Sequence, residues 1–263
     1  MEMARDEAAK PEEETLPEVA EEEMARPKKA EAKKVEEDKP LDAYVLRMKN
    51  LSFVSPQELQ SSGKIAHSVE SKKLLYTGDK IYLQLKDMKN AAIGDRFIVF
   101  DTVQNIEHPK SGKNLGYEIY NKGTVKVIAI DKFVLTAIIT SCSDSIGRGD
   151  KIIPYADPIR KIVPKELDKE VNGYIVGSEQ KHRLIGIREY TYIDKGLNQG
   201  IENGSLFYVV RRGDGMGSSS DKKLPLIIVG KIVVVEAKEN TSTAYVIDSN
   251  KDLEVGDSIK SKL

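Results

Sequence analysis

The sequence predicts an all-β protein with two tandem, duplicated small domains of barrel-like or sandwich-like type, preceded by a disordered tail. Three observations lead to this prediction. Nearly the same sequence pattern occurs twice, in residues 63–154 and again in residues 173–260. Apolar and polar residues alternate in many short runs, which is typical of strands with one face in a core. The first forty residues are rich in Glu, Lys, Ala and Pro and nearly lack β-branched and aromatic residues.

The duplication is visible when the two stretches are aligned. Residues 63–83 fall on residues 173–193 without a gap, at an offset of 110 positions. The same offset places Gly94 on Gly204, and an offset of 107 then places Gly149 on Gly256. A copy of about 90 residues is much longer than the roughly 20–50 residues of a solenoid repeat. Each copy is therefore expected to be a domain with its own core.

Changes in composition predict the domain boundaries. Residues 1–40 hold fourteen acidic and eight basic side chains, and they cannot bury enough apolar surface to offset the entropy lost on ordering. We predict a disordered charged linker there. Residues 41–155 are expected to form the first β-domain, with a lead-in segment that caps it. Residues 156–172 are predicted to be a Pro-containing spacer, and residues 173–263 the second β-domain.

Six short strands are expected in the first copy, and a short helix before them. The helix is predicted at Pro56 because Ser55 and Glu58 have the spacing of a capping box. The alternation of apolar and polar residues places the strands at 63–69, 80–85, 95–103, 117–130, 134–142 and 149–155.

The variable stretches 101–118 and 211–226 are predicted to be exposed hairpin loops, because both are rich in Gly, Ser, Lys and Pro. Loops of this length on a β-scaffold are the natural place for a partner to bind. The alternative, two mobile hairpin tips without a partner, stays open. The candidate partner-contact residues are His108, Pro109, Lys110, Lys113, Arg211, Arg212, Lys222 and Lys223.

Glycines followed by aspartates stand directly before several expected strands. Glycine adopts a positive φ at little cost, and a carboxylate in the next position can accept backbone N–H bonds as the strand begins. We therefore interpret these residues as structural turns and not as a metal or acid–base site. They are Gly78, Asp79, Gly94, Asp95, Gly149, Asp150, Gly256 and Asp257, with Gly204 in the corresponding position of the second copy.

The sequence lacks the spacing of any recognised catalytic, cofactor or metal site. His67, His108 and His182 are far apart in the chain, and Cys142 is a single cysteine that cannot form an internal disulfide. Nucleotide-binding loops and hydrolase or metalloprotease motifs are absent from the sequence. We therefore predict that the protein is not an enzyme and binds neither a cofactor nor a metal.

Charge and hydropathy limit the partners and the compartment. The formal net charge of −1 does not favour nucleic acid as a partner. An alternative is a nucleic-acid-binding barrel, which would depend on Tyr174, Tyr190 and Tyr192 with Arg183 and Arg188 close by. No apolar run reaches the roughly 20 residues that cross a bilayer. No signal peptide is visible, because charged residues stand where its apolar region would lie.

Several segments carry a resemblance to a known family when they are taken in order. They are FVSPQEL, GDKIYL, GDRFIVF, HPKSGKNLGY, GYIVGS, YIDKGLNQGIENG and VGKIVVVEAKENTSTAYVIDSNKDLEVGD. Together the copies resemble the C-terminal region of LysM-containing proteins associated with the type IV pilus secretin. Each repeat is similar to the C-terminal domain of flagellar assembly protein T. The resemblance covers about residues 52–260.

This resemblance implies a periplasmic, non-enzymatic scaffold that helps to anchor or align an envelope protein ring, such as a secretin or a pilus or flagellar component. Peptidoglycan contact is implied only through a LysM module. Since no such module precedes residue 52 here, this contact is expected only if a LysM module lies upstream of the chain, and a truncated or misplaced start is expected. An enzyme with an unrecognised site remains an alternative.

Overall fold

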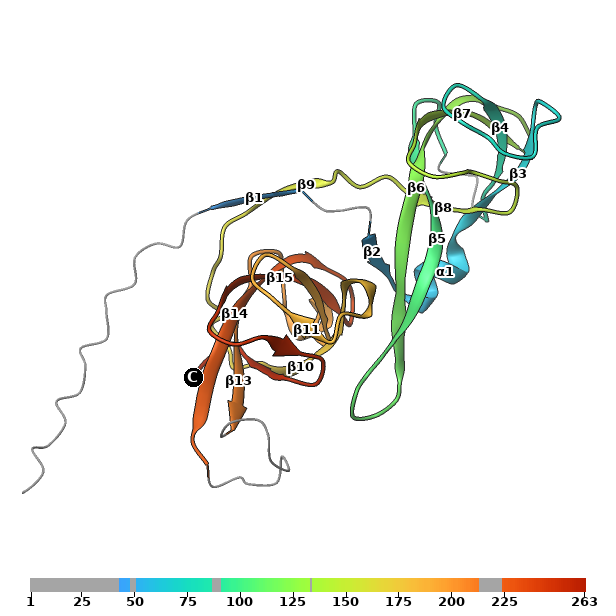
Figure 1. Cartoon of the computed structure of the whole chain (residues 1–263). Helices are drawn as coiled ribbons and strands as arrows, with labels where there is room; N and C mark the ends of the chain where they lie inside the picture. Colours follow the sequence, from blue (N-terminus) through green and yellow to red (C-terminus); the bar gives the residue numbers. More distant parts are fainter. Residues whose placement is uncertain (1–42, 48–50, 87–90, 133, 213–223) are drawn as a thin grey trace, which may run out of the picture. The chain divides into compact units, whose positions relative to one another are not determined.

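The computed structural model describes residues 43–47, 51–86, 91–132, 134–212 and 224–263. The predicted tail at residues 1–40 lies outside these ranges, as do the candidate contact residues Lys222 and Lys223. Within them the chain is built of β-strands with one short α-helix and two 3-10 turns (Figure 1). This confirms the all-β prediction.

The first repeat forms six strands whose pairings close on themselves. They follow each other around the sheet in the order β6-β5-β8-β3-β4-β7, and β6 also pairs with β7. Their bounds are β3 (Gly63–Ser68), β4 (Lys80–Gln84), β5 (Arg96–Glu107), β6 (Asn114–Ile130), β7 (Leu135–Cys142) and β8 (Lys151–Pro154). All six expected strands are therefore present, although β5 and β6 are longer than the alternation predicts.

The second repeat forms a closed barrel in the order β10-β12-β15-β14-β13-β17. Its strands are β10 (Asn172–Ser178), β12 (Tyr190–Ile193), β13 (Leu206–Arg212), β14 (Leu226–Ala237), β15 (Ser242–Ser249) and β17 (Ser258–Lys260). With β10 matched to β3 and β17 to β8, this is the cyclic order of the first repeat. A short pair, β11 (Leu184–Ile185) with β16 (Leu253–Glu254), corresponds to the isolated bridge between Leu75 and Ile146 in the first repeat.

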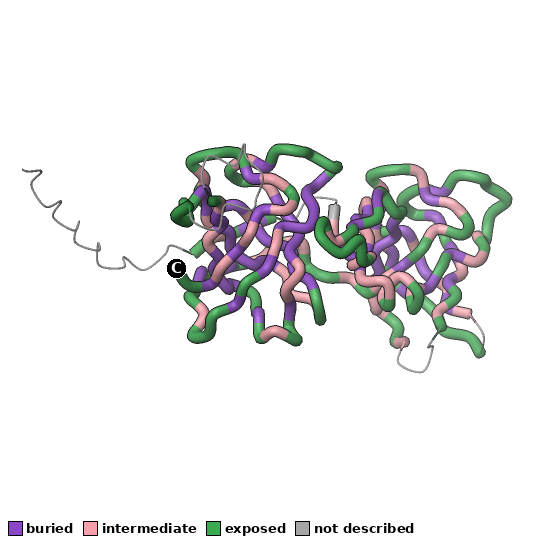
Figure 2. Tube along the Cα trace, turned by 90° about the horizontal axis from the view of Figure 1, so that it is seen from below, coloured by how far each residue is buried: buried purple, intermediate pink, exposed green. Residues whose placement is uncertain are grey.

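Each repeat encloses its own apolar core (Figure 2). In the first repeat Ile65, Val125 and Leu135 are fully buried in one cluster. In the second, Ile175 and Val234 are fully buried in another. Alternate residues of each strand supply these side chains, as the period of a half-buried strand requires. The prediction of small barrel-like or sandwich-like domains is thus confirmed, and the strand order shows that they are barrels.

The lead-in segment divides its contacts between the two repeats. Strand β2 (Leu51–Val54) pairs with β6, and the helix α1 (Pro56–Ser61) begins with the expected capping box. Strand β1 (Tyr44–Arg47) instead pairs with β9 (Ile159–Ile162), which the sequence places in the spacer. Leu46 of β1 packs in a cluster with Tyr190 and Val233 of the second barrel. The lead-in therefore does more than cap the first repeat.

The stretch 101–118, expected to be an exposed loop, is instead a long two-stranded hairpin. Strand β5 runs on to Glu107 and β6 starts at Asn114, so only residues 108–113 form the turn (Figure 1). The strands continue because Ile106 at their end packs against the second repeat, where it is only 3% exposed. A contact so distant in sequence leaves no signal in the composition of the loop.

The glycines predicted to form turns have positive φ angles, from 93° at Gly149 to 102° at Gly256. After the four Gly-Asp glycines, the aspartate carboxylate accepts a backbone N–H from three residues earlier. Asp79 accepts from Tyr76 at 3.0 Å and Asp257 from Glu254 at 2.8 Å. Two further turns, at Gly204-Ser205 and at Arg188-Glu189, have the same hydrogen-bond geometry without the Gly-Asp sequence. In one of them Arg188 has a φ of 69° and Glu189 accepts the N–H of Gly186 at 3.0 Å.

A glycine substitution tests the turn interpretation. No atom lies within 4 Å of a methyl group placed on Gly78, so Gly78→Ala adds no clash and only forces alanine to adopt a φ of 95°. The expected loss is about 1–2 kcal/mol of unfolding free energy, measured by urea titration. The matched control is Gly147→Ala, which also has open space but no positive φ and is expected to be neutral or slightly stabilising. Equal effects of the two changes would contradict the interpretation.

Candidate functional site

The β5–β6 hairpin, residues 101–118, carries the first group of candidate contact residues; we name it the first arm. Its end lies on strands β10 and β12 of the second barrel. The apolar part of this contact is a cluster in which Ile106 meets Val176 and Tyr192, each no more than 3% exposed. Phe53 of β2 completes it, with its ring centroid 5.5 Å from that of Tyr192. The two repeats thus share a small apolar core of their own.

A buried carboxylate lies at the centre of this contact. Glu118 of β6 is 0% exposed and accepts hydrogen bonds from both repeats. The Tyr192 hydroxyl donates to it at 3.1 Å, and the backbone N–H of Gln180 donates to its two oxygens at 3.1 and 3.3 Å. Gln104 of the first arm donates to Glu118 and also to the backbone oxygen of Ser178, the latter at 3.2 Å. A buried charge needs such donors, because its desolvation is otherwise costly.

Burial raises the pKa of Tyr192 well above its ordinary value, and the negative charge of Glu118 adds to this effect. The phenol therefore stays protonated at physiological pH and remains a donor. Glu118 in turn keeps this hydrogen-bond donor. Since both residues are fixed inside the contact, they join the two repeats and do not form a reactive pair that a substrate could reach.

The predicted contact residues at the tip of the first arm also lie against the second barrel. His108 accepts the N–H of Lys110 on Nδ1 at 3.1 Å, and its Nε2 lies 3.4 Å from a carboxylate oxygen of Asp194. The ammonium group of Lys110 lies 3.8 Å from the ring centroid of Tyr174, a cation–π distance. Pro109 and Lys113 are exposed. The side chains of two of the four candidates of this arm, His108 and Lys110, therefore contact other residues of the chain.

The corresponding hairpin of the second repeat is described only near its base; we name the residues 209–212 and 224–228 the second arm. Arg211 points back to its own barrel, where both oxygens of Asp257 accept its guanidinium hydrogens at 2.6 Å. These bonds raise the pKa of Arg211 further. Arg212 donates to the backbone oxygen of Leu224 at 2.6 Å. Both candidates therefore have partners within the second repeat, Arg211 in the turn before β17 and Arg212 across the hairpin.

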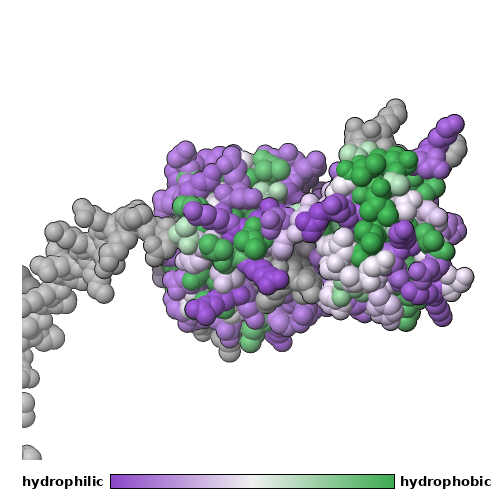
Figure 3. Space-filling view, turned by 90° about the horizontal axis from the view of Figure 1, so that it is seen from above, coloured by the Kyte–Doolittle hydropathy of each residue, from purple (hydrophilic) through white to green (hydrophobic). Residues whose placement is uncertain are grey.

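The second arm exposes apolar side chains. Leu224 and Leu226 are each 41% exposed, Ile227 is 40% exposed and Ile228 is 37% exposed. The first repeat also exposes apolar residues on β6, with Ile128 at 38% and Ile130 at 44%. Figure 3 shows that hydrophobic residues gather on the lobe formed by the first repeat.

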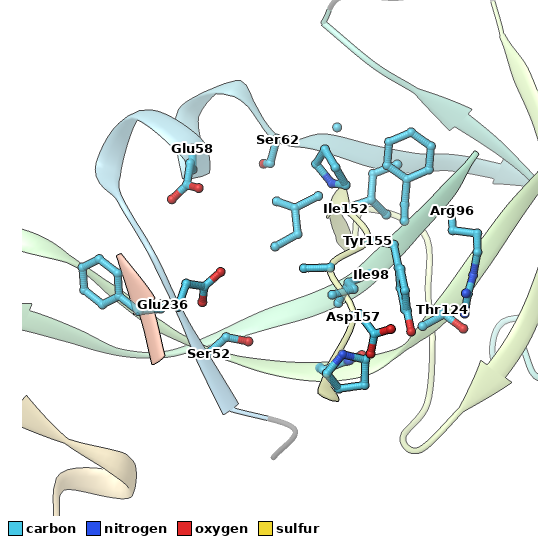
Figure 4. A pocket seen from close by; sticks show the side chains of 18 of the residues that line it. Ser52, Glu58, Ser62, Arg96, Ile98, Thr124, Ile152, Tyr155, Asp157 and Glu236 are labelled. Carbon is cyan, nitrogen blue, oxygen red and sulfur yellow. The ribbon is translucent and has the colours of Figure 1, made fainter. Parts of the chain in front are cut away.

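A cavity of about 870 Å³ is lined by the lead-in, the first sheet, the spacer and β14 (Figure 4). Four of the charged side chains that line it form two pairs. Lys238 lies 2.7 Å from Glu58, and Arg160 lies 3.6 Å from Glu236. Although burial opposes ionisation of Glu58, the bonds from Lys238 and from the Ser55 N–H lower the pKa of this carboxyl. The buried Nε of Arg160 has no hydrogen-bond partner among the described residues.

The described ranges offer little support for a metal site, a membrane-spanning helix or a nucleic-acid-binding surface. They contain no cluster of three or more His, Cys, Asp or Glu side chains placed to hold a metal ion. No helix within them is both long and apolar enough to cross a membrane. Two of the three tyrosines on which a nucleic-acid module would depend are buried and not available for base stacking, because Tyr190 and Tyr192 are 4% and 2% exposed.

The residues that join the repeats were not among those singled out by sequence reasoning. Glu118 carries the one available signal, since it is an acidic residue within the apolar run of an expected strand, Tyr117 to Tyr120. Such a position usually faces solvent. Only the approach of the second barrel shows that it is buried.

No protein-family model matches this chain, and no match was found among curated proteins.

A double-mutant cycle tests the junction between the repeats. Glu118→Ala leaves the Tyr192 hydroxyl and the Gln180 N–H without their acceptor, so we expect a loss of about 1.5–3 kcal/mol in unfolding free energy. In the cycle with Tyr192→Phe, we expect a coupling energy of about 1–2 kcal/mol between the two changes, measured by urea denaturation. The control is Tyr190→Phe, which removes a hydroxyl that donates to the backbone oxygen of Arg47 at 3.3 Å. Coupling as large with Tyr190 as with Tyr192 would refute the assignment.

Proposed function

We propose that the chain is a non-enzymatic interaction protein of the cell envelope that assists the anchoring or assembly of a secretin ring or of a pilus or flagellar-type ring. The observation that carries this proposal is the second arm, which holds Leu224, Leu226 and Ile227 in solvent at the base of a barrel hairpin. Contiguous exposed apolar residues are uncommon on proteins that have no partner. Their presence on a rigid scaffold supports a protein ligand.

The first arm supports the same kind of partner. It is a hairpin of the same design, and its end packs on the sheet surface of another barrel through Ile106 and Glu118. The chain therefore contains one example of the interaction that we propose for the second arm. The pairing of four charged groups in the cavity, Glu58 with Lys238 and Arg160 with Glu236, supports a function without catalysis.

The compartment and the identity of the partner rest on the resemblance of residues 52–260 to secretin-associated and flagellar assembly proteins. The proposal accordingly places the protein in the periplasm. Peptidoglycan contact belongs to it only where a LysM module lies upstream of these residues. The two barrels are proposed to act as the scaffold part.

The test is retention of a purified, detergent-solubilised secretin multimer on the immobilised chain. We expect the double variant Leu224→Ser, Leu226→Ser to retain about tenfold less secretin, because it removes the exposed apolar groups without adding charge. The matched control, Ile128→Ser with Ile130→Ser, removes similarly exposed side chains from the first repeat and should retain it fully.

Two results would contradict the proposal. One is that the unaltered chain retains no secretin, nor any pilus or flagellar ring component tested in the same way. The other is that the arm variant retains as much as the unaltered chain, which would remove the arm as the contact surface.

A further inference from the structure

In the first repeat the outer edge of the arm is covered by an added strand. Strand β2 pairs with β6 in antiparallel register, with Phe53 opposite Glu118 and Val54 opposite Tyr117. Phe53 and Val54 are 2% and 1% exposed, so this strand adds apolar side chains as well as main-chain hydrogen bonds. The edge of β6 is thereby closed.

The second arm has the same construction. The offset of 107 places Tyr117–Tyr120, where β2 pairs, on Leu224–Ile227. Both hairpins also carry a register shift at the same place. It lies between Val99 and Phe100 in the first and between Val209 and Val210 in the second. The edge at Leu224–Ile227 is therefore the geometric counterpart of the edge that β2 covers.

The strand that should cover this second edge is used elsewhere. The offset of 110 carries β2 onto residues 161–164 of the spacer. This segment belongs partly to β9, which pairs with β1, and its Ile162 is buried against Val233 and Val235. Strand β15 reaches β14 only as far as Gly230. Within the described ranges, β14 from Leu226 to Ile228 therefore pairs with β13 alone.

The main chain at this edge is directed outward. The side chain of Asn250 donates to the backbone oxygen of Ile228 at 3.2 Å from the β15 side, away from β13. In an antiparallel strand alternate residues direct their N–H and C=O groups to the same side. Leu226 therefore directs its N–H and C=O groups to the open edge. Pro225 has no N–H, but its main-chain groups face the opposite side, so the open edge loses no hydrogen-bond donor there.

We infer that the open edge of β14 at Leu224–Ile227 accepts an extended segment of a partner protein as an added antiparallel strand. This inference rests on the proposed function, because it assigns how the partner of that function is recognised. The occupant has the chemistry of β2, which is Leu-Ser-Phe-Val, with apolar residues at alternate positions and a small polar residue between them. Main-chain bonds supply affinity and the exposed side chains of Leu226 and Ile227 supply selectivity.

The probe is a fluorescein-labelled peptide with the sequence of residues 49–56, titrated with the full chain and followed by fluorescence anisotropy. The peptide is expected to bind the unaltered chain. Ile227→Lys, which places a charge at the open edge, should weaken binding about tenfold or more. Leu226→Lys is a second variant with the same expected result, and circular dichroism establishes that each variant is folded.

Two controls isolate the edge. Ile130→Lys places the same charge on an exposed isoleucine of β6, which pairs there with Leu135, and should leave peptide binding unchanged. A peptide with serine in place of Leu51 and Phe53 should bind about tenfold more weakly or worse.

The inference is overturned if the peptide does not bind the unaltered chain at about millimolar concentration, or if both edge variants bind it as well as the unaltered chain. It is also overturned if sedimentation shows a dimer of the unaltered chain that Ile227→Lys dissociates, because a second copy then fills the edge. Retention of secretin is a separate readout. Peptide binding at the edge without secretin retention contradicts the proposed function alone, and secretin retention without edge-dependent peptide binding contradicts this inference alone.

Discussion

The contact between the two repeats depends on one buried carboxylate, that of Glu118. Glu118 comes from the first repeat, yet the Tyr192 hydroxyl and the Gln180 N–H that bind it come from the second. A carboxylate in an apolar contact is unfavourable unless its oxygens are fully bonded, so the contact is specific for one arrangement of these donors. Ile106 and Phe53 supply the apolar area around it. The first arm is therefore a fixed part of the structure, and its tip residues His108 and Lys110 are held against Asp194 and Tyr174.

Duplication explains both the likeness and the difference between the repeats. The six strands follow the same cyclic order in both, and the two arms carry the same register shift. The difference arises from what precedes each barrel. Before the first, strand β2 covers the arm; before the second, the equivalent spacer segment pairs with β1 and packs on the barrel through Ile162. The first arm is used to join the repeats, whereas the second arm exposes leucines and, among the described residues, pairs at Leu226–Ile228 with β13 alone.

Much of the fold could be predicted from local patterns, because alternation reports which face of a strand is buried and glycine reports where φ must be positive. The strands of the first repeat and the turns at Gly78 and Gly149 belong to this class. The turn at Arg188 could not be found in this way, since arginine does not mark a left-handed position and only its alignment with Gly78 indicates it. The length of the first arm, the burial of Glu118 and the pairing of β1 with β9 depend on contacts between residues far apart in sequence. No local pattern contains that information.

The most direct test of this account is amide hydrogen exchange at Gln180. Its N–H lies in the short turn Glu179–Lys181, and both of its bonds described by the structure end on Glu118 of the other repeat. If the first arm is docked as described, this amide should exchange as slowly as the barrel amides of β12, and Glu118→Ala should make it exchange at the rate of an open turn while the β12 amides stay slow. Rapid exchange of the Gln180 amide in the unaltered chain would contradict the central claim that Glu118 holds the two repeats together.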